Sequence, residues 1–308
     1  MMFLTNCEGW PGLEAARQAL EGGKPALDVV ELGIRPVEAE PTVDSVGRGG
    51  RPNLLGEVAC DAAIMDGVTL GAGSVAYLKD YLHAISVARK VMERLPHVML
   101  VGDGAARFAA EVGAERAELL TADARQRYDE WMRRHVPARQ DPAWPNVPLA
   151  KHAWESAREF GIGGTVLFLV QDRQGRIAAG TSTSGFANGY PGRVGDTPIA
   201  GAGLYADSRY GACACTHTGE MAIRAGTARS VVLYLKAGAS VDEACLEALR
   251  DLSGLVGGHI GALVIHAIDR EGRACVVTNK DKGEKSSYYL WQQGMAGPEH
   301  LRARVVEM

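Results

Sequence analysis

The stretch Gly163-Gly164-Thr165-Val166-Leu167-Phe168-Leu169-Val170 lies near the middle of a chain of 308 residues. A wholly apolar run of this length, entered through two glycines, predicts a buried β-strand. Thr165 places a hydroxyl at the first residue of that strand, which is an odd position for a core residue. If the peptide bond between Gly164 and Thr165 is cut, the threonine gains a free α-amine beside its own hydroxyl. Nucleophile and base then belong to one residue, as in N-terminal threonine catalysis.

The sequence that follows Thr165 predicts more strands and two helices. Two turns share the pattern Asp-Arg-x-Gly-Arg, at residues 172–176 and 269–273. The aspartate caps such a turn and the glycine adopts its positive φ, so each pattern predicts a β-hairpin. The expected strands are 165–170, 176–182, 262–268 and 273–277, and the expected helices are 220–235 and 241–252, the latter with a capping box at Ser240 and Glu243. This order predicts a layered α/β sandwich, with sheet packed on sheet and helices outside.

The N-terminal half predicts the remaining parts of the same layers. Apolar periodicity and glycine stops predict helices at 13–20, 26–33, 74–95 and 104–112, and short strands at 43–46, 58–64 and 97–101. Residues 122–160 differ, because the apolar pattern fades and four prolines occur between positions 137 and 148. This segment is expected to be an exposed connector that can move or be lost after a cut.

Composition and charge exclude several classes of partner. The net charge is −4 and no long basic block occurs, so nucleic acid is not expected. Neither a signal peptide nor an apolar stretch of about 20 residues is visible, so no membrane association is expected. Six cysteines are too few for a disulfide scaffold, and Cys213 and Cys215 are too close together for the usual zinc pair. We therefore expect a cytoplasmic protein without a metal or an organic cofactor.

Three polar groups follow Thr165, and each has two interpretations. Residues 181–185, Thr-Ser-Thr-Ser-Gly, are either a hydroxyl-rich strand end or part of a site. Arg193 and Asp196 lie in a glycine-flanked loop, where they either form a local salt bridge or hold the carboxylate and ammonium of an α-amino acid. Residues 216–220, Thr-His-Thr-Gly-Glu, are either a helix N-cap or a set of donors facing an oxyanion.

These motifs, in this order and spacing, resemble the asparaginases that use an N-terminal nucleophile. The family includes glycosylasparaginase, plant-type L-asparaginase and isoaspartyl peptidase. The most specific match is Gly192 to Asp207, Gly-Arg-Val-Gly-Asp-Thr-Pro-Ile-Ala-Gly-Ala-Gly-Leu-Tyr-Ala-Asp. The N-terminal half is similar too, at 44–47, 61–67, 87–93 and 97–102. The form of residues 45–52 looks more like the glycosylasparaginase branch.

The resemblance implies a fold, an assembly and a set of roles. The fold is the four-layer αββα sandwich, as one domain cleaved into an α subunit, 1–164, and a β subunit, 165–308. The assembly is a dimer of cleaved αβ heterodimers. Thr165 is the implied nucleophile, Thr183 assists it by hydrogen bonding, and Thr216 with the N–H of residue 217 forms the oxyanion hole. Arg193 binds the substrate α-carboxylate and Asp196 its amine. Further implied substrate contacts come from Ser45, His217 and Gly219.

Four positions depart from the family pattern. His217 and Leu167 stand where glycine is usual, and Gly164 replaces the aspartate of the glycosylasparaginase branch. Cys7 stands where that branch has a tryptophan. The expected activity is hydrolysis of a small β-amide, with N4-(β-N-acetylglucosaminyl)-L-asparagine ranked first. L-Asparaginase or isoaspartyl peptidase activity ranks second, and a non-catalytic binding relative is the third alternative.

Overall fold

The strand that follows Thr165 is buried along its whole length. The computed structural model describes residues 1–160 and 164–307, so Gly163 lies outside the described residues. Strand β5 (Val166–Gln171) pairs antiparallel with β6 (Ile177–Thr183), and Gly175 takes a φ of 75° in the turn between them. The Asp172 carboxylate accepts hydrogen bonds from the backbone N–H groups of the turn. The first predicted hairpin is therefore confirmed.

The strands form two sheets. The eight-stranded sheet has the order β12-β11-β1-β5-β6-β2-β3-β4, in which the new strands are β1 (Met2–Asn6), β2 (Cys60–Asp66), β3 (Ala72–Leu78), β4 (Met99–Val101), β11 (Ser287–Gln292) and β12 (Glu299–Arg302). The five-stranded sheet has the order β13-β10-β9-β8-β7, with β7 (Leu204–Asp207), β8 (Gly211–His217), β9 (Leu263–Asp269), β10 (Ala274–Thr278) and β13 (Arg304–Val305). Strands β9 and β10 pair antiparallel, which confirms the second hairpin.

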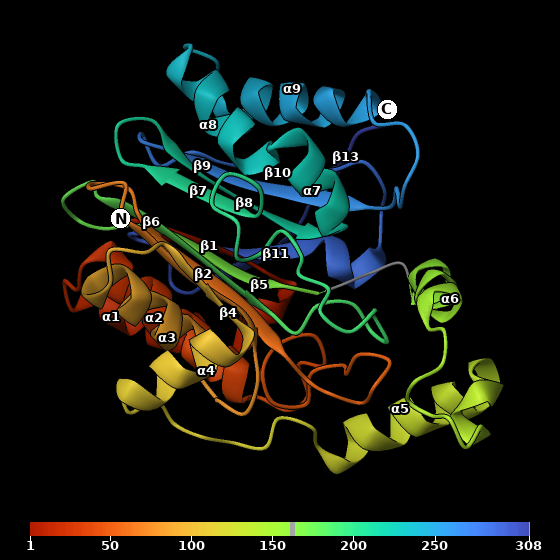
Figure 1. Ribbon diagram of the computed structural model, residues 1–308. Coiled ribbons are helices and arrows are strands. Elements are labelled where there is room, and N and C mark those ends of the chain that lie inside the picture. The colour runs from red at the N-terminus through yellow and green to blue at the C-terminus, as the bar shows by residue number, and fades with distance from the viewer. Residues whose placement is uncertain (161–163, 308) are drawn as a thin grey trace.

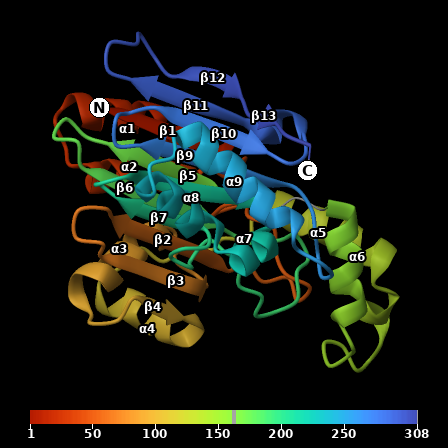
Figure 2. The same cartoon turned by 90° about the horizontal axis from the view of Figure 1, so that it is seen from above.

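Three apolar cores separate four layers, which confirms the predicted αββα sandwich (Figures 1 and 2). Helices α1 (Leu13–Glu21), α2 (Ala26–Ala39), α3 (Ala84–Arg94) and α4 (Gly102–Glu111) cover the larger sheet, and α7 (Gly219–Ala225), α8 (Thr227–Lys236) and α9 (Val241–Ser253) cover the smaller. Val166 and Phe168 pack toward the first helical layer, whereas Leu167 packs between the sheets. Strand β5 is apolar from Val166 to Val170 because both of its faces are covered.

Some predicted elements have different bounds. The expected helix 74–95 is wrong at its start, because residues 72–78 form β3 and the helix begins only at Ala84. Tyr77 and Asp80 have positive φ values of 53° and 66°, which an α-helix excludes. The expected strand 43–46 is instead a turn-rich loop. The expected helix 220–235 is divided into α7 and α8 by Gly226, whose φ is 61°. The capping box of α9 is present as predicted.

The segment 122–160 lies beside the sandwich and is more regular than the sequence indicates (Figures 1 and 2). It contains α5 (Ala122–His135) and α6 (Ala150–Phe160). Tyr128, Trp131 and Met132 of α5 form a small apolar cluster with Leu54. These side chains recur at positions three and four apart, which places them on one face of the helix.

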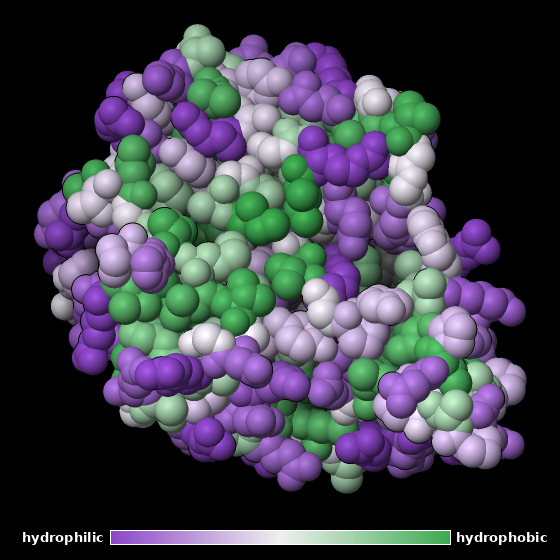
Figure 3. Space-filling model, in the orientation of Figure 1, coloured by the Kyte–Doolittle hydropathy of each residue, from purple (hydrophilic) through white to green (hydrophobic). Residues whose placement is uncertain are grey.

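The surface follows the layering. In the view of Figure 3, apolar residues gather in a band between the two helical layers, and polar residues are more frequent above and below it. Among the helices of the described chain, none has the length and apolar character needed to cross a membrane.

Candidate active site

Four of the predicted site residues lie where strands of the two sheets begin or end, namely Thr165, Thr183, Thr216 and His217. Strand β6 ends at Thr183, which faces Asp61 at the start of β2. Because β5 runs antiparallel to β6, its first residues lie beside the last residues of β6. Thr165 precedes β5 directly and is only 5% exposed. Antiparallel pairing thus brings Thr165 and Thr183 together.

Thr183 contacts the predicted cleavage point directly. Its Oγ1 donates a hydrogen bond of 2.6 Å to the carbonyl oxygen of Gly164. The backbone N–H of Gly185 donates to the same Oγ1 at 3.0 Å, which fixes the hydroxyl. In the continuous chain, Thr183 is therefore directed at the carbonyl that precedes Thr165.

Asn6 holds the next peptide unit, which joins Thr165 to Val166. Its Nδ2 donates to the carbonyl oxygen of Thr165 at 2.7 Å, and its Oδ1 accepts from the N–H of Leu167 at 3.2 Å. Asn6 ends β1, which pairs with β5. Asn6 was not predicted as a site residue, because a lone asparagine near the N-terminus carries no motif.

Gly164 is enclosed by two polar side chains. A β-carbon at this position would collide with Ser45 Oγ and with Glu8 Oε1. Ser45 donates a hydrogen bond to Glu8, and Lys285 forms an ion pair with the same carboxylate. Only a residue without a side chain fits here. Ser45 thus lies at the predicted site, whereas Glu8 and Lys285 were not predicted.

Arg193 and Asp196 do not pair with each other among the residues that the structure describes. The Arg193 guanidinium instead binds Glu220, with contacts of 2.9–3.0 Å, and lies 3.9 Å above the ring centre of Phe186. The local Arg–Asp salt bridge is thus replaced by a pair with Glu220. This role of Glu220 was not predicted from the sequence.

Asp196 presents a buried and half-satisfied carboxylate. It is 5% exposed, and its Oδ2 has no hydrogen-bond partner among the described residues. Burial raises the pKa of Asp196 to about 7, although the nearby Arg193 lowers it in part. Gly219 packs so closely that a β-carbon there would collide with Asp196 Oδ1. The free oxygen can accept a hydrogen bond from a ligand such as an ammonium group.

Asp61 supports the loop that carries Arg193 and Asp196. Its Oδ1 accepts from the N–H of Tyr77 at 2.8 Å, and its Oδ2 accepts from the N–H of Gly195 at 3.3 Å. Burial raises the pKa of Asp61 to about 6. Asp61 lies in a stretch that resembles the family, but its role was not predicted from the sequence.

Thr216 and His217 end β8 and are both buried. His217 has a φ of 86°, in the region that favours glycine. Its Nδ1 lies 3.0 Å from Thr216 Oγ1, and its Nε2 is without a partner in the described chain. Burial, together with the charges of Lys285 and Lys282, lowers the pKa of His217 to about 4. The imidazole is therefore neutral at neutral pH.

Comparison with known proteins identifies the family. The model of the asparaginase family matches residues 12–289. The chain belongs to the asparaginase family. An N(4)-(β-N-acetylglucosaminyl)-L-asparaginase from Elizabethkingia miricola is 40% identical over 252 residues, which cover 82% of this chain and 67% of that protein. A protein of the same name from Rattus norvegicus is 35% identical over 286 residues, covering 86% of this chain and 82% of that one.

The second activity named among the relatives is that of a peptidase. An isoaspartyl peptidase from Salmonella typhimurium is 35% identical over 286 residues, covering 92% of this chain and 86% of that protein. The resemblance drawn from the sequence is therefore confirmed at the level of the family, and the chain is a hydrolase of the asparaginase class.

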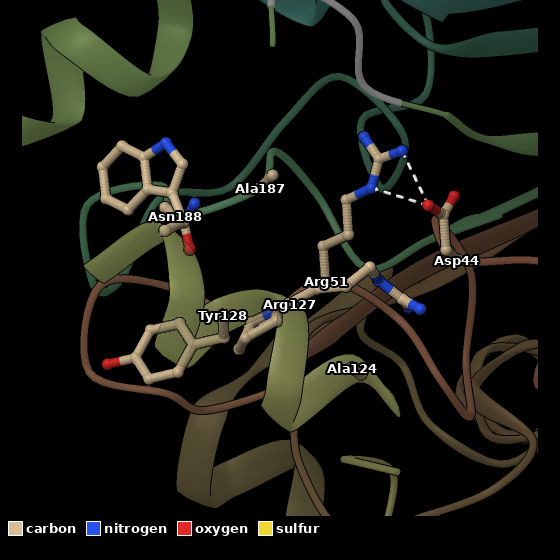
Figure 4. Close-up of a pocket in the computed structure, with 9 residues that line it drawn as sticks. Asp44, Arg51, Ala124, Arg127, Tyr128, Ala187 and Asn188 are labelled. Carbon is tan, nitrogen blue, oxygen red and sulfur yellow. Dashed lines mark hydrogen bonds and ion pairs between the residues drawn. The ribbon is translucent and has the colours of Figure 1, made fainter. Parts of the chain in front are cut away.

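Two cavities of about 120 Å³ or more lie near the site of this asparaginase-family chain. The larger, about 370 Å³, opens onto Arg193 and Glu220 and is bounded by α6. The smaller, about 120 Å³, lies between α5 and the loops beside Asp44 and Arg51, which form a 2.7 Å ion pair (Figure 4). Of these two cavities, only the larger contacts a predicted substrate-binding residue, which is Arg193. Within the described residues, no cluster of histidine, cysteine, aspartate or glutamate side chains is arranged to hold a metal ion.

Proposed function

We propose that this chain is an autoprocessing amidohydrolase with Thr165 as its nucleophile. Cleavage between Gly164 and Thr165 would divide it into an α subunit, 1–164, and a β subunit, 165–308. The observation that carries the proposal is the 2.6 Å hydrogen bond from Thr183 to the Gly164 carbonyl. Such a donor polarises the carbonyl at which the neighbouring Thr165 hydroxyl would attack.

The proposed chemistry has two stages. In the first, Thr165 Oγ1 bonds to the Gly164 carbonyl carbon, the peptide C–N bond breaks, and water hydrolyses the resulting ester. In the second, the new α-amine accepts the hydroxyl proton while Thr165 attacks a β-amide carbonyl of the substrate. The amide C–N bond then breaks as that proton passes to the departing amine, which leaves the β-aspartyl ester on Thr165. An α-amine has a pKa near ~8, so a useful neutral fraction exists close to neutral pH. Water then releases aspartate from the β-aspartyl enzyme.

The proposed substrate has an α-amino-acid head group. Arg193 would bind its carboxylate and Asp196 its ammonium, with Ser45, His217 and Gly219 as further contacts. Thr216 Oγ1 and the N–H of His217 would receive the oxyanion. Arg193→Lys loses the fork geometry, so we expect KM to rise about tenfold, or ~1.4 kcal/mol. An unchanged KM would indicate that Arg193 does not bind the substrate and only forms its ion pair with Glu220.

We rank the candidate substrates, which differ in their leaving group. N4-(β-N-acetylglucosaminyl)-L-asparagine is proposed first, since two of the relatives described above carry that name. Free asparagine and β-aspartyl dipeptides come second, since the chain is also similar to isoaspartyl peptidases. Three substrates, one of each kind and scored by released aspartate, separate these activities by kcat/KM.

The decisive experiment is mass spectrometry of the purified, active protein. The proposal expects a fragment that begins at Thr165, and expects Thr165→Ala to remain one intact and inactive chain. Hydrolysis by a protein that contains only the full-length chain would refute it. Full-length chain without hydrolysis would support the alternative of a binding relative. Leu167, which departs from the family pattern, packs in the core between the sheets and is not a reason to prefer that alternative.

The proposed assembly is a dimer of cleaved αβ heterodimers. Strand β4 is an edge of the larger sheet. Val98, directly before it, and Val101, its last residue, are 53% and 52% exposed. Apolar residues also gather between the helical layers in Figure 3. An apolar sheet edge favours contact with another protein. Light scattering should give twice the chain mass of 32.8 kDa. A reducing, cytoplasmic location is also proposed, in keeping with the six free thiols.

A further inference from the structure

A buried carboxylate lies beside the proposed cleavage point. Glu8 belongs to a short 3-10 helix, η1 (Cys7–Gly12), and is 4% exposed. Its Oε1 lies 2.5 Å from the point where a β-carbon at position 164 would stand. The carboxylate therefore lies against the α-carbon of Gly164, one bond from the carbonyl carbon that Thr165 would attack.

Two partners hold this carboxylate in place. The Ser45 hydroxyl donates to Oε2, and the Lys285 ammonium, from η3 (Gly283–Ser286), binds Oε1. Asn6, two residues before Glu8, holds the carbonyl oxygen of Thr165. One short segment of the chain thus contacts both residues of the bond to be cut.

Self-cleavage needs a proton acceptor that the nucleophile cannot supply. Before the cut, the nitrogen of Thr165 belongs to an amide, whose lone pair is delocalised and therefore not basic. The α-amine that serves later turnovers does not yet exist. The Thr165 hydroxyl proton must therefore pass to another group as the new C–O bond forms.

We propose that Glu8 is the proton acceptor in self-cleavage, a role that rests on the proposed function of Thr165. As Oγ1 of Thr165 bonds to the Gly164 carbonyl carbon, its proton passes to the Glu8 carboxylate. As the C–N bond breaks, the same proton passes to the Thr165 nitrogen, which becomes the amine of the ester. Water then hydrolyses the ester into a carboxyl group on Gly164 and the free hydroxyl of Thr165. Glu8 ends the step as it began.

The test follows conversion of freshly translated, pulse-labelled full chain into two fragments. Glu8→Gln keeps the size of the side chain and loses its basicity, so cleavage should slow about 100-fold or more. The matched control is Glu31→Gln. Glu31 likewise binds a serine hydroxyl and a cation, Ser86 and Arg89, but lies on α2 in the outer helical layer. We expect that control to cleave at the wild-type rate.

Chemical rescue separates a catalytic role from a merely structural ion pair. Glu8→Ala leaves room for a small carboxylate, so added formate should restore cleavage in proportion to its concentration, whereas chloride should not. Glu8→Gln cleaving as fast as wild type, or Glu8→Ala that stays uncut at every formate concentration while circular dichroism shows it folded, would overturn the role of Glu8. Wild-type chain that never cleaves would instead refute the proposed function.

Discussion

The Nδ1 of His217 lies 3.0 Å from the Oγ1 of Thr216, so two neighbouring residues at the end of β8 share one hydrogen bond. A threonine hydroxyl has a single proton to donate. When the neutral imidazole carries its proton on Nδ1, it donates to Thr216 and leaves the hydroxyl proton available for an oxyanion. If the ring proton is on Nε2 instead, Nδ1 accepts the hydroxyl proton of Thr216, which is then not available to an oxyanion.

We expect His217 to act through Thr216 rather than independently. His217→Gly removes the ring and accepts the positive φ, so kcat should fall about fivefold to tenfold, the effect of one hydrogen bond of ~1 kcal/mol. Thr216→Ala should lose about 10²–10³ in kcat. Adding His217→Gly to Thr216→Ala should then change kcat less than about twofold. Steady-state kinetics of all four proteins complete the cycle, and fully additive losses would contradict the coupling.

Asp196 predicts how substrate binding depends on pH. Its carboxylate must be ionised to bind an ammonium group, and burial raises its pKa to about 7. We therefore expect kcat/KM to rise as the pH increases through about 7. The α-amine of Thr165 adds a second rise near ~8. In Asp196→Asn the first rise should vanish and the second remain. A profile of kcat/KM in which Asp196→Asn keeps both rises would exclude Asp196 from binding the amine.

The raised pKa of Asp196 also predicts that the folded chain is less stable above neutral pH than at low pH. The folded-state pKa of about 7 exceeds the ordinary value of 3.8, so the folded chain retains a proton that the unfolded chain releases between these values. The contribution of the protonated Asp196 carboxyl to the stability of the folded chain is therefore present at low pH and lost as the pH rises toward 7. In the uncut background of Thr165→Ala, Asp196→Asn should melt a few degrees higher at pH 8 but not at pH 4. Equal melting temperatures at pH 8 would contradict the burial argument.

Gly164 predicts a steric limit on maturation. In Gly164→Ala the new methyl group would collide with Ser45 and Glu8, so the peptide unit must shift from the Thr183 hydroxyl. We expect this variant to fold and to remain largely uncut on a denaturing gel. Gly104→Ala is the control, because a β-carbon there meets nothing within 4 Å. Normal cleavage of Gly164→Ala would show that the enclosure of Gly164 is not needed.

The elements that the sequence predicted correctly follow from local rules. Strand β5 is apolar from Val166 to Val170 because two cores cover it, and the two hairpins follow from the Asp and Gly of their turns. The helix predicted from 74 failed for a non-local reason. Val75 and Leu78 are spaced three apart, which suits a helix, but β3 pairs with β2 and the Tyr77 N–H is bound by Asp61, sixteen residues away.

The chain order of motifs was sufficient to predict the family and the sandwich. The roles of Thr165, Thr183 and Asp196 also come from recognisable local patterns, and they stay predictions. The contacts at the site could not be predicted in this way. Glu8 reaches Gly164, and Asn6 reaches Thr165, across about half of the chain, since sheet pairing brings β1 beside β5. Partners of this kind are selected by the packing of whole strands, and no spacing within the sequence encodes them.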